Sequence, residues 1–205
     1  MSRFNVNSVP IRSEALSESL AELETDMPDR PVTFERSVPE GDNRTRNVCS
    51  TCGFIDYVNP KIVAGAVVFN PAGEILMCRR AIEPRVGYWT LPAGFMEQGE
   101  SVEEAAMREA FEEARAVIEI EELIGVYSVP RISQVQIFFR AQLAEPEISA
   151  GPESLEVRFF ALDALPESEF AFPSVRWAVD DYLARQGKTG VAPEMRTQAK
   201  TITPY

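Results

Sequence analysis

The sequence predicts an α/β fold in which a mixed β-sheet lies between helices, as in an α/β/α sandwich with an N-terminal extension. Residues 61–69 and 74–79 are apolar runs with a turn between them, which is typical of paired strands. Further strand-like runs follow at 117–129 and 134–143. Two amphipathic stretches, each introduced by a helix-capping residue, are predicted to cover the sheet.

Composition excludes several classes of function. The chain has 205 residues, enough for one domain with an extension and a sizeable core. Its net charge is −12 and it has no dense basic stretch, which argues against nucleic acid as a partner. It has no histidine, so a Ser-His-Asp triad and every histidine-ligated zinc site are excluded.

The chain carries no recognisable targeting or membrane segment. No apolar run is long enough to span a bilayer, so no membrane partner is expected. Residues 14–29 are acidic and lack the apolar centre of a signal peptide, and their acidity also argues against an organelle transit peptide. Three cysteines fit a reducing compartment better than a disulfide framework. We therefore expect a cytoplasmic protein.

The two ends of the chain are expected to lie outside the catalytic domain. Residues 1–38 are predicted to be a mobile arm, because prolines end their one short amphipathic stretch. Residues 188–205 are polar and are predicted to be a loose tail. The domain itself is assigned to residues 61–187, and the segment 39–60 precedes it.

The segment 39–60 contains a cysteine pair. Cys49 and Cys52, followed by a glycine, have the spacing of a zinc knuckle, in which a tight turn aims two thiolates at one metal. Structural zinc takes four ligands, and no second pair exists; Cys78 is more simply a small buried residue. Zinc is not expected in a single chain, while a homodimer that shares one ion remains open.

Arginines follow the first predicted hairpin. Arg79, Arg80 and Arg85 are either an exposed hairpin end that balances an acidic protein, or a clamp for a diphosphate. The planar guanidinium group suits the second role, and both interpretations remain open. The next short strand contains Trp89, which we expect in the core.

An acidic helix is predicted directly after Ser101, because Ser101 and Glu104 form a capping box. Within it Glu109, Glu112 and Glu113 stand at positions i, i+3 and i+4, so they share one face. Like charges at this spacing repel each other, whereas a hard divalent cation such as Mg²⁺ would hold them together. A solvated acidic face is the simpler explanation of three glutamates alone.

Strands and one more helix complete the chain. Tyr127 and Phe139, in the predicted strand pair, are candidates to line an aromatic pocket, though buried packing explains them equally well. The acidic loop 150–156 leads into another strand. Ser174 is predicted to cap the last helix, and Gly187 to end it.

A longer pattern surrounds the acidic helix. Gly94, Glu100 and Arg108 precede the three glutamates at fixed spacings, and the whole stretch resembles the signature of the Nudix hydrolases. That family forms a loop-helix-loop which binds a divalent metal and hydrolyses diphosphates linked to another moiety. The resemblance implies a Nudix fold and a Mg²⁺ or Mn²⁺ cofactor. One position departs from it, since the family usually has glycine where this chain has Arg115.

The resemblance also implies the metal ligands. Glu109, Glu112 and Glu113 would hold the metal, with the main-chain carbonyl of Ala93 as an additional ligand.

Supporting roles follow from the same resemblance. Arg108 would fix one carboxylate of the cluster, and Glu100 would fix Arg108 or reach a second metal through water. In the loop 150–156 the family often has a glutamate that is a further metal ligand or the general base, and here Glu153 is the first choice and Glu156 the second. Which glutamate is the base stays open.

The segment 39–60 resembles the second half of a zinc ribbon found ahead of some Nudix domains. In those proteins a first cysteine pair precedes a Pro-Glu-Gly-Asp turn, which here is residues 39–42. The stretch ahead of this turn has no cysteine, so the resemblance implies a ribbon that keeps its shape and has lost its metal.

Several segments between residues 39 and 183 resemble the plant and bacterial Nudix hydrolases that cleave FAD, a group that overlaps in activity with ADP-ribose and NADH pyrophosphatases. The implied partner is a small dinucleotide, and the implied reaction is hydrolysis of FAD to FMN and AMP. Cleavage of ADP-ribose or NADH is one alternative. A catalytically inactive Nudix sensor is another, which the presence of all three helix glutamates disfavours.

Overall fold

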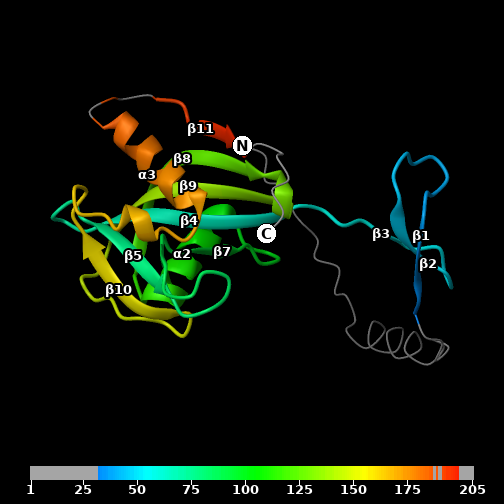
Figure 1. Cartoon of the computed structure of the whole chain (residues 1–205), viewed down its shortest axis with the longest axis horizontal. Coiled ribbons are helices and arrows are strands. Elements are labelled where there is room, and N and C mark those ends of the chain that lie inside the picture. The colour runs from blue at the N-terminus through cyan, green and yellow to red at the C-terminus, as the bar shows by residue number, and fades with distance from the viewer. Residues whose placement is uncertain (1–31, 187, 189–190, 199–205) are drawn as a thin grey trace, which may run out of the picture. The chain divides into compact units, whose positions relative to one another are not determined.

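The computed structural model describes residues 32–186, 188 and 191–198, and the chain divides into two units, residues 1–58 and 59–205 (Figure 1). In the first unit, β1 (Phe34–Ser37), β2 (Arg46–Cys49) and β3 (Ile55–Asp56) form an antiparallel sheet in the order β1-β2-β3. β1 precedes residue 39, so the ribbon-like segment begins within the stretch predicted to be an arm. Residues 1–31 of that arm lie outside the described residues.

The turn after β2 holds the cysteine pair. The amide of Gly53 donates to the carbonyl of Cys49 at 2.9 Å, and Gly53 has a φ of +74°, which a residue with a Cβ rarely adopts. The amide of Ser50 donates to the carbonyl of Thr33 at 3.0 Å, and the two hydroxyl oxygens lie 2.5 Å apart. Hydrogen bonds therefore fasten the segment ahead of β1 to this turn.

The second unit contains a mixed sheet in the order β10-β5-β4-β9-β8-β11. The pairs β4–β9 and β8–β11 are parallel, and the other neighbours are antiparallel. The strands are β4 (Lys61–Phe69), β5 (Ile75–Arg80), β8 (Ile118–Val129), β9 (Gln134–Leu143), β10 (Ser154–Phe160) and β11 (Glu194–Thr197). Two short strands extend it: β6 (Trp89–Thr90) pairs with β5, and β7 (Ala93–Phe95) pairs with β4.

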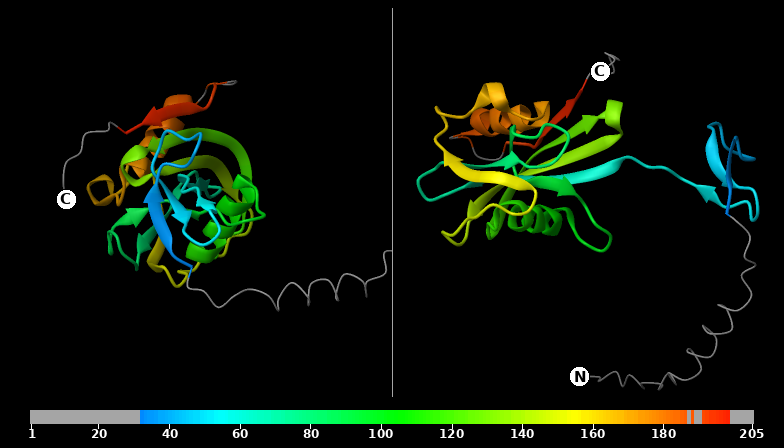
Figure 2. Two further views of the ribbon diagram at one scale, coloured as in Figure 1. Left: turned by 90° about the vertical axis from the view of Figure 1, so that its right-hand side faces the viewer. Right: turned by 60° about the horizontal axis from the view of Figure 1, so that its bottom comes forward.

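The helices α2 (Val102–Ala114) and α3 (Pro173–Arg185) cover opposite faces of this sheet (Figure 2). Consecutive residues of β4 show this, because strand side chains alternate between faces. Val67 packs in a cluster with α3, whereas Val68 packs in a cluster with Ala110 and Ala114 of α2. The predicted α/β/α arrangement is confirmed. Two short 3-10 helices, Pro130–Ile132 and Glu167–Glu169, lie in the connections.

The predicted start of α2 is confirmed. The Ser101 hydroxyl accepts from the amide of Glu104 at 3.2 Å, and the Glu104 carboxylate accepts from the amide of Ser101 at 2.7 Å. The helix ends at Ala114, and the capping residue Arg115 has a left-handed φ of 53° at the position where the family usually has glycine. Trp89 and Cys78 are buried, as expected.

Two expectations about the C-terminal part are wrong. Ser174 does not cap α3, because the helix already begins at Pro173, whose fixed φ suits a first helical position. The helix ends at Arg185, and Gly187, the residue predicted to end it, lies outside the described residues, so that prediction is not tested. Residues 194–197, predicted to belong to a loose tail, form β11 instead.

An ion pair joins this strand to α3. The guanidinium of Arg196 in β11 pairs with the carboxylate of Asp181 in α3, with 3.0 Å between Nε and Oδ2. Asp181 is buried, and it also accepts a hydrogen bond of 2.9 Å from the hydroxyl of Tyr127. Burial raises the pKa of Tyr127 above its ordinary value. Tyr127 is thus a core residue and not, as predicted, part of a substrate pocket.

Within the described part of the chain, no helix combines the length and the apolar character that crossing a membrane requires.

Candidate active site

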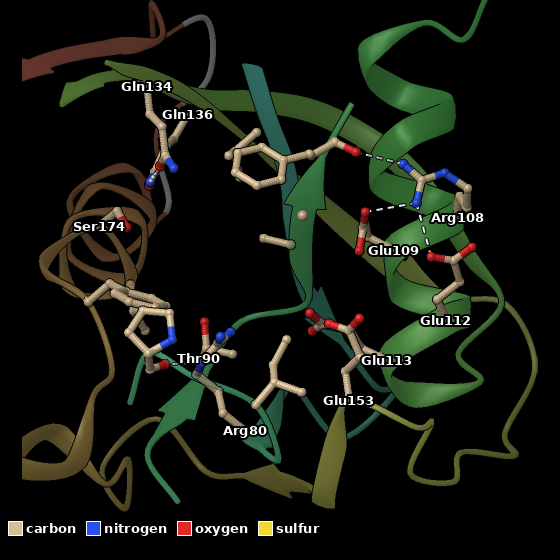
Figure 3. A pocket seen from close by; sticks show the side chains of 18 of the residues that line it. Arg80, Thr90, Arg108, Glu109, Glu112, Glu113, Gln134, Gln136, Glu153 and Ser174 are labelled. Atoms are coloured by element: carbon tan, nitrogen blue, oxygen red, sulfur yellow. Dashed lines mark hydrogen bonds and ion pairs between the residues drawn. The ribbon is translucent and has the colours of Figure 1, made fainter. Parts of the chain in front are cut away.

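A cavity of about 690 Å³ opens beside α2, β7, the start of β9 and the N-terminus of α3. Its volume is in the range of sites that bind nucleotide-sized ligands. Figure 3 shows charged side chains on one side of it and Gln134, Gln136 and Ser174 on the other. The charged wall consists of Arg80, Arg108, Glu109, Glu112, Glu113 and Glu153.

Arg108 organises this wall. Its guanidinium donates two hydrogen bonds to Glu100, of 2.8 and 3.0 Å, and one of 2.9 Å to the carbonyl of Phe95. It also donates to Glu109 at 2.8 Å and to Glu112 at 3.0 Å. The hydrogen bonds from Arg108 lower the pKa of Glu100 to about 2, so this ion pair persists across the neutral range. Arg108 therefore ties the loop before α2 to the carboxylates of α2.

Glu109 and Glu113 are buried next to each other, with 9% and 6% of their surfaces exposed. Burial raises the pKa of both groups; for Glu113 the charge of Glu109 adds to this effect, and its pKa reaches about 8. Oε2 of Glu113 has no hydrogen-bond partner among the described residues. Two adjacent buried carboxylates with an unpartnered oxygen require either a proton or a cation.

The donor set fits a hard divalent cation, which prefers carboxylate oxygens. Within residues 32–198, as far as they are described, no three acidic or cysteine side chains converge as metal ligands do, and Glu109 and Glu112 each pair with Arg108 instead. The Glu112 side chain is 55% exposed, so it can turn toward the other carboxylates. Glu109, Glu113 and Glu112 would hold the ion. Ala93, the candidate main-chain ligand, lines the same cavity.

Two glycines allow the chain to pass close to α2. A Cβ on Gly94 would lie 2.4 Å from the carboxylate of Glu109, and a Cβ on Gly151 would lie 1.7 Å from the carbonyl oxygen of Glu112. The amide of Gly151 donates to the carbonyl of Glu113 at 2.9 Å. This contact fixes the loop 150–153 at the end of α2 and brings Glu153 into the cavity.

The predicted arginine clamp is divided between two sides of the strand. Arg80 lines the cavity, with its guanidinium 5.1 Å from the ring centre of Phe172. Arg79, the preceding residue, points the other way, and its Nε donates to the carbonyl of Gly87 at 2.9 Å. Arg85 lies over the ring of Tyr88, outside the cavity lining. Of the three arginines, only Arg80 faces the carboxylates.

Of the two candidate glutamates in the loop 150–156, one lies in the cavity and the other does not. Glu153 lines the cavity, and its charge contributes to the raised pKa of Glu113. Glu156 is not in the lining; its carboxylate lies 3.8 Å from the guanidinium of Arg79. Glu156 is therefore not placed to bind a metal in this cavity.

The comparisons with known proteins identify the family. Residues 59–178, more than half of the chain, match the model of the NUDIX domain, and residues 32–58 match a zinc-ribbon model described as Nudix N-terminal. This chain belongs to the Nudix family. A crystal structure of a Nudix hydrolase from Nitrosomonas europaea is 38% identical and has a TM-score of 0.77; the match covers 84% of this chain and 97% of that one.

Two curated Nudix relatives are similar in sequence. An ADP-ribose pyrophosphatase of Methanocaldococcus jannaschii is 33% identical over 131 residues, which cover 62% of this chain and 75% of that protein. The NAD-capped RNA hydrolase NudC of Pseudomonas aeruginosa is 31% identical over 139 residues, which cover 67% of this chain. The match spans only 49% of NudC.

Among the described residues of the Nudix N-terminal unit, no three cysteine or acidic side chains are grouped as metal ligands. Main-chain hydrogen bonds from Cys52 and Thr51 lower the pKa of Cys49, as a zinc knuckle requires. The whole sequence contains one further cysteine and no histidine. That cysteine, Cys78, is buried in β5 of the other unit. Two thiols do not complete the four ligands of structural zinc.

Sequence reasoning missed the uncharged wall of the Nudix cavity. Its main members are Val63, Phe95, Gln134, Gln136, Phe138 and Phe172. Tyr127 and Phe139 were the expected aromatic residues, but Phe138 lines the cavity and Phe139 packs on the opposite side with Ala105. No local motif marks these positions, because they come together only through strand pairing.

Proposed function

We propose that this protein is a metal-dependent hydrolase that cleaves the diphosphate bond of an ADP-linked dinucleotide, with FAD as the first substrate and FMN and AMP as products. The observation that carries this proposal is the pair of buried carboxylates, Glu109 and Glu113, with an unpartnered oxygen at the wall of a 690 Å³ cavity. The dinucleotide assignment continues the resemblance to Nudix enzymes that cleave FAD.

Each charged residue of the wall has a distinct task in this proposal. A bound Mg²⁺ or Mn²⁺ would neutralise the diphosphate and activate water. Arg80 lines the cavity close enough to interact with the charge of Glu113, and its guanidinium can donate hydrogen bonds to a phosphate oxygen. Arg108 holds Glu109 in place through its 2.8 Å bond. Glu153 is the candidate base, since its carboxylate borders the same space.

The names of the relatives favour a second candidate. FAD, ADP-ribose and NADH share an ADP half, so one diphosphate site can serve all three. ADP-ribose is the alternative substrate, because the similar archaeal protein is an ADP-ribose pyrophosphatase. The similar NudC proteins act on NAD-capped RNA, but a net charge of −12 opposes binding of an RNA chain. A free dinucleotide therefore remains our proposal.

We also propose that the protein works in the reducing cytoplasm, where Cys49, Cys52 and Cys78 would remain the free thiols that they are in the structure. Whether it is a homodimer stays a prediction.

A substrate panel tests the proposed function. FAD, ADP-ribose and NADH are incubated with the full-length protein and Mg²⁺ or Mn²⁺, with and without EDTA, and products are separated by chromatography. We expect the highest kcat/KM for FAD, with FMN and AMP in equal amounts and no product in EDTA. A higher kcat/KM for ADP-ribose would replace FAD by the second candidate. If none of the compounds is hydrolysed, the hypothesis of a catalytically inactive sensor replaces the proposed function.

A further inference from the structure

The uncharged wall of the cavity has a regular construction. Gln136 of β9 is the register partner of Val63 of β4, and Val63 is in turn the register partner of Phe95 of β7. All three line the cavity, so an amide, a small aliphatic group and an aromatic ring form one row across three neighbouring strands. Since neighbouring strands lie about 4.8 Å apart, this row is about 10 Å long. That length matches a planar multi-ring group better than a sugar.

Burial supports the same conclusion. Val63 is 9% exposed and Phe138 is 3% exposed, so they form a closed apolar floor. Phe95 is 46% exposed although it is a large apolar side chain next to the charged wall. Its own carbonyl accepts a hydrogen bond from Arg108, which holds the backbone of this residue in place. The ammonium group of Lys61 lies 4.7 Å from the centre of the Phe95 ring, so a flat ligand ring would stack on the face that Lys61 leaves free.

The two glutamines give this floor a polar edge. Gln134 and Gln136 lie two residues apart on β9, so they point to the same side of the strand. Nε2 of Gln136 donates to Oε1 of Gln134 at 2.9 Å. This bond leaves Oε1 of Gln136 as an acceptor and Nε2 of Gln134 as a donor, and within the described residues neither atom has another partner. The pair therefore offers one donor beside one acceptor.

We propose that this wall is a subsite for a planar heteroaromatic ring, in which Phe95 stacks on the ring and Gln134 and Gln136 read an edge with adjoining donor and acceptor groups. The inference rests on the proposed function only in that both use the same cavity. Such an edge occurs in adenine and in the pyrimidine part of isoalloxazine, and ribose 5-phosphate has none. The glutamines are thus specificity-determining residues, while the charged wall performs the hydrolysis.

Binding of cleavage products tests the subsite without requiring turnover. AMP, FMN and ribose 5-phosphate are titrated calorimetrically into the full-length protein in EDTA. We expect at least one ring-bearing product to bind about tenfold or more tightly than ribose 5-phosphate. Tighter binding of AMP identifies adenine as the ring, and tighter binding of FMN identifies isoalloxazine. Equal affinities for all three compounds would overturn the proposal.

Variants locate the effect. Gln136→Leu and Phe95→Leu should each weaken binding of the ring-bearing product about five- to twentyfold and leave ribose 5-phosphate unchanged. Gln142→Leu is the matched control, because Gln142 lies on the same strand, also half-buried, but outside the cavity lining. Unchanged affinity in both test variants, with melting temperatures equal to that of the parent, would overturn the proposal.

Turnover separates this inference from the proposed function. If the parent protein hydrolyses a dinucleotide, Gln136→Leu should raise KM about tenfold and leave kcat within about twofold. A fall in kcat without a change in KM would contradict a role in ring binding. The parent protein could bind FMN or AMP without hydrolysing any dinucleotide. If Gln136→Leu then weakens that binding, the proposed function fails and the subsite stands.

Discussion

Replacing Glu113 by glutamine is predicted to stabilise the metal-free protein and to remove its response to Mg²⁺. Glu113 is 6% exposed, and one of its oxygens has no partner among the described residues. It faces Glu109 on α2, Arg80 and Cys78 on β5, and Glu153 in the loop before β10. Arg80 is the one cation of this set, so the carboxylate is held where its charge is poorly compensated.

The size of the effect follows from the pKa. Moving the pKa of Glu113 from 4.5 to about 8 corresponds to roughly 4–5 kcal/mol against the ionised form. Burying the neutral amide of glutamine costs about 1–3 kcal/mol in desolvation, which offsets part of this gain. A net gain of about 1–4 kcal/mol remains at pH 8, which is roughly 2–16 °C in melting temperature for a domain of this size.

The direction in which stability changes with pH follows from proton binding. The pKa of Glu113 is higher in the folded than in the unfolded chain, so the folded state binds more protons between about pH 4.5 and pH 8. The stability of the metal-free parent should therefore fall as the pH rises through this window. Glu113→Gln lacks this contribution, so its advantage should be larger at pH 8 than at pH 6.

Thermal melts in EDTA at pH 6 and pH 8, repeated at pH 8 with Mg²⁺, measure both effects. Glu103→Gln is the matched control, because Glu103 is an exposed glutamate of the same helix. Mg²⁺ should raise the melting temperature of the parent and of the control, but not that of Glu113→Gln. The reasoning fails if Glu113→Gln melts below the parent in EDTA at pH 8, or if Mg²⁺ stabilises it as much as the parent.

Three further predictions concern the backbone and the cysteines. Gly94→Ala should lower kcat about tenfold or more with little change in melting temperature. The new Cβ would lie 2.4 Å from the Glu109 carboxylate and would force that carboxylate to move. An unchanged kcat would refute this. Arg115→Gly should be neutral or stabilising by up to about 1 kcal/mol, more so at high salt, since it relieves a positive φ and loses an exposed cation whose contacts are a 3.5 Å hydrogen bond to the Phe111 carbonyl and the face of the Phe111 ring. Melts at two salt concentrations check it, and clear destabilisation would show that the Arg115 side chain matters more than the strain. Elemental analysis should find no stoichiometric zinc, because Cys49 and Cys52 are only two ligands; one zinc per chain would contradict this, and half a zinc would indicate a site shared by two copies.

Local sequence rules predicted the parts of this protein that local interactions determine. The capping box at Ser101 begins α2 where expected, since both of its hydrogen bonds join residues three positions apart. The positive φ of Arg115 could likewise be read from the family pattern at a helix end. The continuous apolar run at residues 61–69 predicted the strand β4, whose residues pack on both faces of the sheet.

Features that depend on distant residues could not be predicted in this way. β8 contains register shifts between Ile120 and Glu122 and between Leu123 and Gly125, so counting along the strand does not reveal which face Tyr127 occupies. β11 exists because residues 194–197 pair with β8 and Arg196 reaches Asp181. The two glutamines of the ring subsite have no motif at all. Their role becomes visible only when β9, β4 and β7 are placed side by side.

The most direct test of the central claim is the Mg²⁺-dependent turnover of Glu112→Gln beside that of Glu103→Gln, with the parent's best dinucleotide as substrate. Both changes remove one exposed negative charge from α2, but only Glu112 lines the cavity. The account predicts that Glu112→Gln lowers kcat by about 100-fold or more, while Glu103→Gln stays within about twofold of the parent. If Glu112→Gln retains most of its activity at saturating Mg²⁺, the acidic face of α2 is not the metal site and the account is wrong.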